Sequence, residues 1–435
     1  MKTVAFTTLG CRVNQYDTDA MRGLFLQNGY ETVNFDDKAD IYVINTCSVT
    51  NMGERKSRQL IRKAKRTNEN AYIIVTGCYA QLAPDAIAAI EGVNLVIGTN
   101  NRHRIVELVE QLDSTEKQIS VVRNIMEQST FEEMPLYGNE IDKVRAFMKI
   151  QEGCNNYCTF CIIPYTRGKL KSRRIEDILA EAKRLVAHGY REIVLTGIHL
   201  GNYGVELPEK TTLADVVKAL LTIPELQRIR LGSIESVEVS DELINLMATE
   251  PRFCSHLHLP LQAGSDHILK LMNRHYTLDE FKQLVKRLRS RIDGLVITTD
   301  IIAGFPGETD EDFDDTMNTV REIGFTHIHA FPYSKREGTP AAVMEDQVPE
   351  AVKKTRVALL NSLSHEGFTK YANTLIGQTV EILVEQEVDG QYLGFTNDYI
   401  HGTINKELIN CQVGDIVTGV VTAVADEKVV VEPKQ

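Results

Sequence analysis

Short β-branched runs alternate with amphipathic stretches along most of this 435-residue chain, and that alternation constrains its fold more than any other feature. Continuous apolar runs separated by helical patterns favour parallel sheets that helices cover on both faces. The first series has predicted strands at Val4–Leu9, Ile41–Thr46, Tyr72–Gly77 and Leu95–Thr99, and predicted helices at Asp19–Asn28, Arg55–Arg66 and Asp85–Glu91. Residues 1–125 are therefore expected to form an open parallel α/β sheet domain.

The alternation restarts after a polar stretch, residues 126–142, which we interpret as a linker. Six further strands are predicted, at Ala146–Gln151, Glu192–Ile198, Arg228–Ile234, His256–Leu261, Val296–Gly304 and His327–Tyr333. Six β/α units in sequence predict a partial (β/α)6 barrel, short of the usual eight units. This domain is expected to span residues 143–371 and to end in a long helix, Glu350–Asn373.

The last part of the chain, residues 372–435, has an all-β pattern. Five short predicted strands, punctuated by glycines, lie at Val380–Val384, Gln391–Phe395, Ile400–Ile404, Asp415–Val424 and Lys428–Val431. Such spacing predicts a small closed barrel of the OB-like kind. The expected fold class is thus α/β, with an open sheet, a partial barrel and a C-terminal β-barrel.

No run approaches the roughly 18 apolar residues of a membrane span. The segment Met1–Cys11 has the outline of a lipoprotein signal, but two threonines interrupt a short apolar stretch, so we interpret it as a strand. We therefore expect a cytoplasmic protein with no membrane partner. In that compartment, its eight cysteines are expected to be metal ligands or thiols rather than disulfides.

Three cysteines, Cys154, Cys158 and Cys161, form a CxxxCxxC pattern directly after the first predicted barrel strand. Active sites of such barrels lie at this end of the strands. Three thiolates can hold three irons of a [4Fe–4S] cluster and leave the fourth iron open. A zinc site or free thiols is the alternative, but zinc usually takes four ligands in paired spacings. A redox cluster with an open iron is the expected metal centre here.

Cys11, Cys47 and Cys78 are far apart in sequence, but each ends a predicted strand. Strand ends of an open parallel sheet converge on the crevice where ligands bind. These three thiols are therefore expected to hold a second cluster, with buried structural cysteines as the alternative. Cys254 and Cys411 have no partner by spacing and are interpreted as simple thiols.

The net charge of −12 repels phosphate, so a nucleic-acid partner would need locally basic faces. Two basic runs follow cluster cysteines, although such runs are often only solvated surface. They are Arg55, Lys56, Arg58, Arg62, Lys63, Lys65 and Arg66, then Arg167, Lys169, Lys171, Arg173 and Arg174. Residues 371–435 are acidic, so RNA contact there would depend on aromatic residues, namely Tyr392, Phe395 and Tyr399.

The CxxxCxxC motif, with Phe160 before its last cysteine, resembles the radical S-adenosylmethionine (SAM) superfamily. Across nearly the whole chain the sequence is similar to the methylthiotransferases of that superfamily. The matching stretches are Thr8–Gln15, Gly153–Arg174, His258–Ser265, Asp300–Thr309 and Tyr333–Ala341. The resemblance implies two [4Fe–4S] clusters, SAM as a further cofactor, and a C-terminal TRAM domain that binds RNA.

The resemblance also implies the division of labour. One SAM would donate a methyl group to sulfur held at the Cys11/Cys47/Cys78 cluster, and a second would be cleaved at the Cys154/Cys158/Cys161 cluster to activate carbon 2 of an adenine. The residues expected to bind SAM are Phe160, Thr196, Gly197, Ser236, Gln262, Asp300 and Arg336. Turn glycines, helix caps and solvated charge are the structural alternatives.

The segment Thr7–Tyr16 resembles the branch that acts on threonylcarbamoyladenosine in transfer RNA. The carboxylate of that base calls for a cation, and the candidate substrate-binding residues are Arg12, Arg167 and Arg173, with Arg336 as a further cation. The implied partners are the tRNA anticodon stem-loop and an electron donor such as flavodoxin or ferredoxin. Alternatives are an isopentenyladenosine enzyme, an enzyme for an aspartate of a ribosomal protein, and a non-catalytic iron–sulfur RNA-binding protein.

Overall fold

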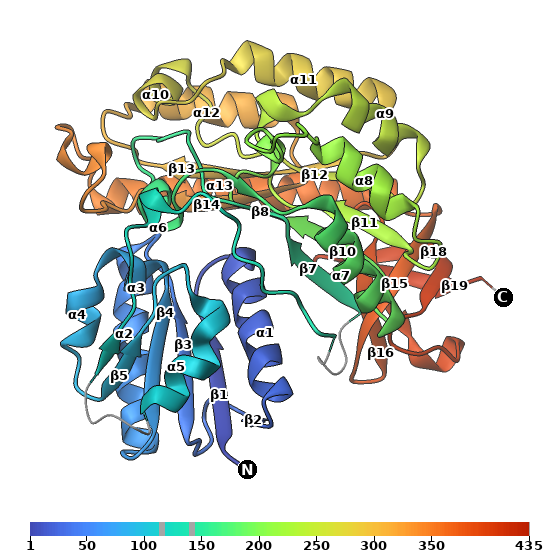
Figure 1. Ribbon diagram of the computed structural model, residues 1–435. Coiled ribbons are helices and arrows are strands. Elements are labelled where there is room, and N and C mark those ends of the chain that lie inside the picture. Colours follow the sequence, from blue (N-terminus) through green and yellow to red (C-terminus); the bar gives the residue numbers. More distant parts are fainter. Residues whose placement is uncertain (113–117, 139–143, 435) are drawn as a thin grey trace.

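The computed structural model describes residues 1–112, 118–138 and 144–434, and in them the chain folds into an open sheet, a partial barrel and a small closed barrel (Figure 1). The N-terminal sheet has the parallel order β2-β1-β3-β4-β5-β6. Its strands are β1 (Thr3–Thr8), β2 (Glu31–Val33), β3 (Ile41–Thr46), β4 (Tyr72–Gly77), β5 (Val93–Val96) and β6 (Ile119–Ser120). The predicted parallel sheet is confirmed.

Helices cover this sheet on both faces, as its apolar strands require. On one face, side chains such as Phe6 and Val43 pack against α1 (Arg12–Gln27) and α5 (Ile105–Leu112). On the other face, Ala5 and Tyr42 lie in a second core with residues of three helices. These helices are α2 (Asn51–Thr67), α3 (Cys78–Leu82) and α4 (Pro84–Ala88).

The central domain contains six parallel strands in two three-stranded sheets, ordered β11-β10-β7 and β12-β13-β14. The strands are β7 (Arg145–Lys149), β10 (Glu192–Thr196), β11 (Arg228–Leu231), β12 (His256–His258), β13 (Val296–Ala303) and β14 (His327–Pro332). Single parallel bridges, Ile229 with Phe253 and Ser233 with His258, join the two sheets. The six strands therefore form the predicted partial barrel.

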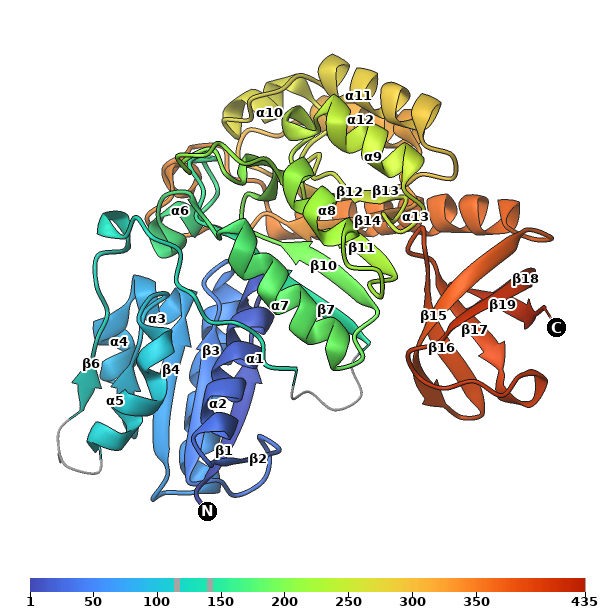
Figure 2. The same cartoon turned by 45° about the vertical axis from the view of Figure 1, so that its right-hand side comes forward.

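Six helices follow the barrel strands on the outside, visible in green to orange in Figure 2. They are α7 (Ile175–Ala187), α8 (Leu213–Leu221), α9 (Asp241–Thr249), α10 (Asp266–Leu271), α11 (Leu278–Arg291) and α12 (Asp310–Ile323). Capping boxes start three of them, for example Thr277 with Glu280 at α11. A long helix, α13 (Glu350–Thr374), packs along β14 and leads to the C-terminal barrel.

The C-terminal barrel is closed, with strands in the order β15-β16-β17-β19-β18. They are β15 (Thr379–Val388), β16 (Gln391–Thr396), β17 (His401–Asn405), β18 (Ile416–Ala425) and β19 (Lys428–Pro433). Two arginines of β11 in the central domain bond to the backbone of this C-terminal barrel. Arg228 donates to the carbonyl oxygens of Phe395 and Glu381 at 2.8 and 2.9 Å, and Arg230 donates to Asn397 O at 3.0 Å.

The aromatic residues expected to contact RNA in this last part have another role. Tyr399 stacks on Phe395 at 4.7 Å and lies 4.6 Å from the ring of His256 at the start of β12. Arg145 lies over the Phe395 ring at 4.8 Å, and Tyr392 is buried in the core of the small barrel. Phe395 and Tyr399 therefore help to join the two barrels while staying half-buried, and Tyr392 is a core residue; RNA contact through Phe395 and Tyr399 stays a prediction.

None of the helices in the described part of the chain combines the length and the apolar character needed to cross a membrane.

Candidate active site

The first three cysteines of interest are Cys154, Cys158 and Cys161, here called the barrel triad. They lie in the loop after β7 and the short strand β8 (Gln151–Glu152), at the C-terminal end of the first barrel strand. Gly153 takes φ +78°, and a Cβ there would lie 1.8 Å from the carbonyl oxygen of Lys169. Only glycine fits this approach. The Cys154 N–H also donates to Gly168 O at 3.0 Å, which fixes the start of the loop.

Each sulfur of the barrel triad lies near a hydrogen-bond donor. The pairs are the Asn156 N–H with Cys154 Sγ at 3.5 Å, Arg274 Nη1 with Cys158 Sγ at 3.3 Å, and the Ile163 N–H with Cys161 Sγ. Donors to sulfur stabilise the thiolate, which is the form that ligates metal. The donor set therefore fits three iron-bound thiolates.

His199 contacts the barrel triad from the loop after β10. Its Nδ1 lies 3.6 Å from Cys154 Sγ, and its Nε2 forms an ion pair with Glu238. Although burial lowers the pKa of His199, its hydrogen bonds with Cys154 and Glu238 raise that pKa to about 10. A cationic imidazole beside Cys154 favours the thiolate.

The second set is Cys11, Cys47 and Cys78, here called the N-terminal triad. The three follow β1, β3 and β4, so the expected position at one sheet edge is confirmed. Gly10 takes φ +102°, and a Cβ there would lie 3.1 Å from Cys47 Sγ, which places the Cys11 loop against Cys47. Cys47 and Cys78 are buried, whereas Cys11 is exposed. One side of this triad is therefore open to solvent.

Burial keeps several of these thiols protonated in the absence of metal. Desolvation raises the pKa of Cys47 to about 11, although the hydrogen bond from the Val49 N–H lowers it. Desolvation likewise raises the pKa of Cys161 to about 12, although the hydrogen bond from the Ile163 N–H lowers it. Metal binding deprotonates such ligands and releases protons. Both triads are three-thiol sets, because Cys254 lies beside Arg230 and Cys411 beside Tyr392, away from either triad.

A short helix, α6 (Ile163–Arg167), joins the two triads. It begins just after Cys161, packs against α3 at the N-terminal triad, and is visible between the two domains in Figure 1. Its last residue, Arg167, donates from Nε to Cys78 Sγ at 3.3 Å. The next residue, Gly168, accepts the hydrogen bond from Cys154.

Arg167 belongs to a buried ion network that spans the two domains. The members are Asp17, Arg102, Glu132, Lys149, Glu152 and Arg167. Lys149 on β7 bonds to Asp17 on α1 at 2.6 Å, and Arg167 Nη1 bonds to the same carboxylate at 2.9 Å. All of these side chains are at most 5% exposed. Breaking one partner of a buried pair costs several kcal/mol, so this network is expected to fix the domains relative to each other.

Five of the seven residues expected to bind SAM lie on or after strands of the barrel. Thr196 ends β10 and Gly197 follows it. Asp300 lies on β13 with Oδ1 3.3 Å from His258 Nε2, and Gln262 follows β12 with φ +64°. Ser236 follows β11, and its buried Oγ has no hydrogen-bond partner among the described residues. An orphaned buried hydroxyl at this mouth fits a bound polar ligand.

Phe160 lies within the barrel triad loop and packs edge-on against Phe305, with ring centroids 6.4 Å apart. Its place next to Cys161 agrees with the expected proximity to the cluster. Its contact in the described structure is with the core.

Three arginines are not placed as expected. Arg336 is 3% exposed, and its guanidinium bonds to Asn51 at 2.6 Å and to Glu54. It therefore joins α2 to the barrel, and its guanidinium is occupied by protein partners rather than open to a ligand. Arg167 and Arg173 are likewise buried and paired with carboxylates, so they cannot contact a substrate directly.

Arg12 is the candidate cation that remains exposed. It follows Cys11, and its guanidinium lies 4.4 Å from the ring centroid of Phe147 on β7. No ion-pair partner of Arg12 is found in residues 1–112, 118–138 and 144–434. An anionic group that approaches the N-terminal triad would therefore meet an unneutralised positive charge.

Exposed cations line α2, which begins shortly after Cys47. Arg55, Lys56, Arg62 and Arg66 are exposed, and the described structure gives them no ion-pair partner. Beside the barrel triad, Tyr157 and Tyr165 are 40% and 43% exposed, with ring centroids 6.1 Å apart. Cations with accessible aromatic faces are typical of single-stranded RNA contact.

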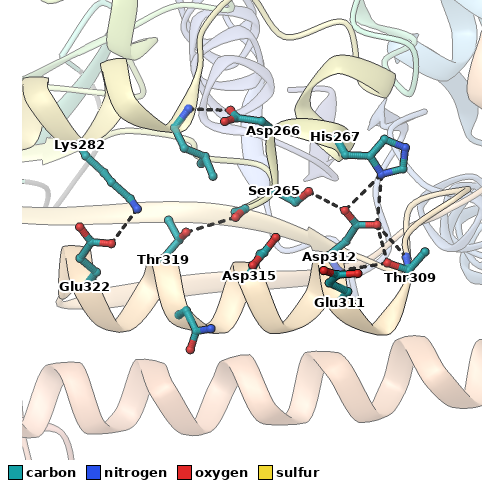
Figure 3. A pocket seen from close by; sticks show the side chains of 13 residues that line it. Ser265, Asp266, His267, Lys282, Thr309, Glu311, Asp312, Asp315, Thr319 and Glu322 are labelled. Carbon is teal, nitrogen blue, oxygen red and sulfur yellow. Dashed lines mark hydrogen bonds and ion pairs between the residues drawn. The ribbon is translucent and has the colours of Figure 1, made fainter.

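A cavity of 650 Å³ lies elsewhere, on the outer side of the barrel between α10, α11 and α12 (Figure 3). Two of its carboxylates have side-chain partners. Asp312 accepts from Ser265 at 2.6 Å, and Glu322 pairs with Lys282 at 2.7 Å. An acidic cavity without a thiol fits neither cluster nor nucleic acid.

Arg274 and His199 contact the barrel triad, and Glu238 pairs with His199, but none of the three was predicted from the sequence. Arg274 lies more than a hundred residues after Cys158 and carries no spacing signal. His199 lies shortly after the end of β10, and this strand-end position was the sequence signal that could have indicated its place near the barrel triad.

Two family models match the chain on the two triad-bearing parts. Residues 3–98 match the uncharacterized protein family UPF0004, and residues 148–320 match the radical SAM superfamily. The first range contains the N-terminal triad and the second contains the barrel triad.

Curated relatives match over most of the chain. A threonylcarbamoyladenosine tRNA methylthiotransferase MtaB of Bacillus subtilis is 46% identical over 92% of this chain and 90% of its own length. The MtaB of Aquifex aeolicus is 40% identical, covering 88% and 93%. A tRNA-2-methylthio-N(6)-dimethylallyladenosine synthase of Pelotomaculum thermopropionicum is 39% identical, covering 89% and 88%.

Among solved structures, the fold is similar to the radical SAM methyltransferase TsrM of Kitasatospora setae. The TM-score is 0.58 at 15% identity, covering 79% of this chain and 77% of that one. This likeness supports the arrangement of an open α/β domain next to a radical SAM barrel.

Proposed function

The chain belongs to the radical SAM methylthiotransferases, and from that premise we propose that it attaches a methylthio group to carbon 2 of threonylcarbamoyladenosine next to the anticodon of tRNA. The observation that carries the proposal is the pair of cysteine triads, which α6 joins across the two domains. A single cluster would serve electron transfer or SAM cleavage alone. With two three-thiol sites, a cluster on the barrel triad would activate the base and a cluster on the N-terminal triad would deliver sulfur.

The residues that would hold the clusters are the barrel triad and the N-terminal triad. When bound, the clusters together with SAM supply the radical chemistry and the sulfur-transfer chemistry. The protein supplies orientation and exclusion of water. Thr196, Gly197, Ser236, Gln262 and Asp300 are proposed to bind SAM, because they converge on the mouth that the barrel triad occupies.

Arg12 is proposed to bind the carboxylate of the threonylcarbamoyl group. Its exposed charge lies next to Cys11, so a base presented to the N-terminal triad would place that carboxylate within reach. An isopentenyl group is apolar and would leave Arg12 unpaired. The names of the Bacillus and Aquifex relatives support the same substrate. A tRNA substrate implies a cytoplasmic enzyme, and an electron donor such as flavodoxin or ferredoxin would supply reducing equivalents.

Iron content tests the two-cluster arrangement. Anaerobic reconstitution of the full chain is expected to give about eight irons per chain, four for each cubane cluster. Replacing Cys11, Cys47 and Cys78 with alanine is expected to halve this number, whereas the matched Cys254→Ala and Cys411→Ala variants keep it. Four irons in the unchanged protein would contradict the second cluster.

The exposed face of α2 is proposed as part of the tRNA contact. Replacing Arg55 and Lys56 with alanine is expected to weaken tRNA binding and to lower the slope of log K against log salt by about one for each cation, because each neutralised phosphate releases counterions. Fluorescence anisotropy over a salt series measures both quantities.

The matched control replaces Lys286 on α11 and Lys354 on α13 with alanine, since both are exposed and the net charge changes equally. This control is expected to bind tRNA with the original slope. Equal effects of the two double variants would show that α2 contributes only to the overall charge.

A further inference from the structure

We propose that Arg167 sets the reduction potential of the cluster on the N-terminal triad through its bond to Cys78. Arg167 is thereby a positioning residue, and this inference rests on the proposed second cluster. The residue stands at the end of α6, after the barrel triad in sequence but beside the N-terminal triad in space. No other arginine in the described residues donates to a sulfur of the N-terminal triad.

The guanidinium of Arg167 is fully buried and its donors are used in three directions. Nε donates to Cys78 Sγ at 3.3 Å, Nη1 bonds to Asp17 at 2.9 Å and to Glu152, and Nη2 bonds to Asn14. The planar fork of arginine can satisfy these partners at once, whereas the single ammonium of lysine cannot. The sulfur contact is therefore built into a rigid arrangement.

Arg167 keeps its positive charge at this position, because the guanidinium of arginine stays protonated in proteins. Its guanidinium forms ion pairs with the carboxylates of Asp17 and Glu152, which are buried with it. A fixed cation that donates to a ligating sulfur stabilises the electron added on reduction. Hydrogen bonds to cluster sulfurs and local net charge are the protein's main means of setting such potentials.

Arg102 provides a matched control within the same ion network. It is also fully buried and pairs with Asp17 and with Glu132 at 2.9 Å. Its hydrogen bonds and ion pairs in the described structure are all to carboxylates. Arg102 therefore places a similar positive charge in the same ion network, without a bond to sulfur. A purely structural role predicts equal effects of changing either arginine.

The test uses the full chain in which the barrel triad is replaced by alanine, so that one cluster remains. The protein is titrated with dithionite in the presence of redox mediators, and the reduced cluster is followed by electron paramagnetic resonance. Arg167→Gln is expected to make reduction at least tenfold less favourable, which corresponds to about 59 mV toward negative values for a one-electron couple. Arg167→Lys is expected to shift the potential in the same direction by a smaller amount, and it carries the test if Arg167→Gln does not fold.

Arg102→Lys is expected to leave the potential unchanged. An equal shift in Arg102→Lys and Arg167→Lys, or no shift in a folded Arg167 variant, would overturn the role of Arg167. Failure of the underlying proposal has a separate signature, because a parent protein without the N-terminal cluster would contain no iron in this background.

Discussion

Replacing Cys154, Cys158 and Cys161 together with alanine is expected to abolish the cleavage of SAM to 5′-deoxyadenosine. The three thiols are the complete ligand set at the barrel mouth, since Cys254 and Cys411 lie beside Arg230 and Tyr392. Without them the barrel has no site where SAM could be bound at iron and reduced. Liquid chromatography of reaction mixtures with dithionite measures the product.

The N-terminal triad gives the contrasting result. Replacing Cys11, Cys47 and Cys78 with alanine is expected to leave 5′-deoxyadenosine formation in place and to abolish the methylthio product, because the barrel triad and the SAM-facing residues are untouched. Circular dichroism confirms that both variants fold, and Cys254→Ala serves as a control thiol. Loss of SAM cleavage as the only defect in both variants would contradict the division of labour between the triads.

The sequence predicted the positions of both triads because those positions depend on local pattern. Each cysteine follows a strand whose apolar run is continuous, and parallel strands end at a common edge. The strands β2 and β6, at Glu31–Val33 and Ile119–Ser120, were missed because two or three residues are too short to show a period.

The roles of the arginines could not be predicted in the same way. Arg167 and Arg173 belong to a basic run that is indistinguishable from a solvated face, and their partners Asp17 and Glu133 are far away in sequence. Burial of a charge depends on where distant carboxylates come together. The contact of Tyr399 with His256 could not be predicted either, because docking of the two barrels leaves no sequence pattern.

The most direct test of the proposed substrate is nucleoside analysis of tRNA from a strain that lacks the gene. We expect methylthio-threonylcarbamoyladenosine to disappear, threonylcarbamoyladenosine to accumulate, and methylthio-isopentenyladenosine to remain. The unchanged gene should restore the modification, and an Arg12→Ala gene should restore it poorly. Loss of methylthio-isopentenyladenosine, with methylthio-threonylcarbamoyladenosine unchanged, would contradict the account.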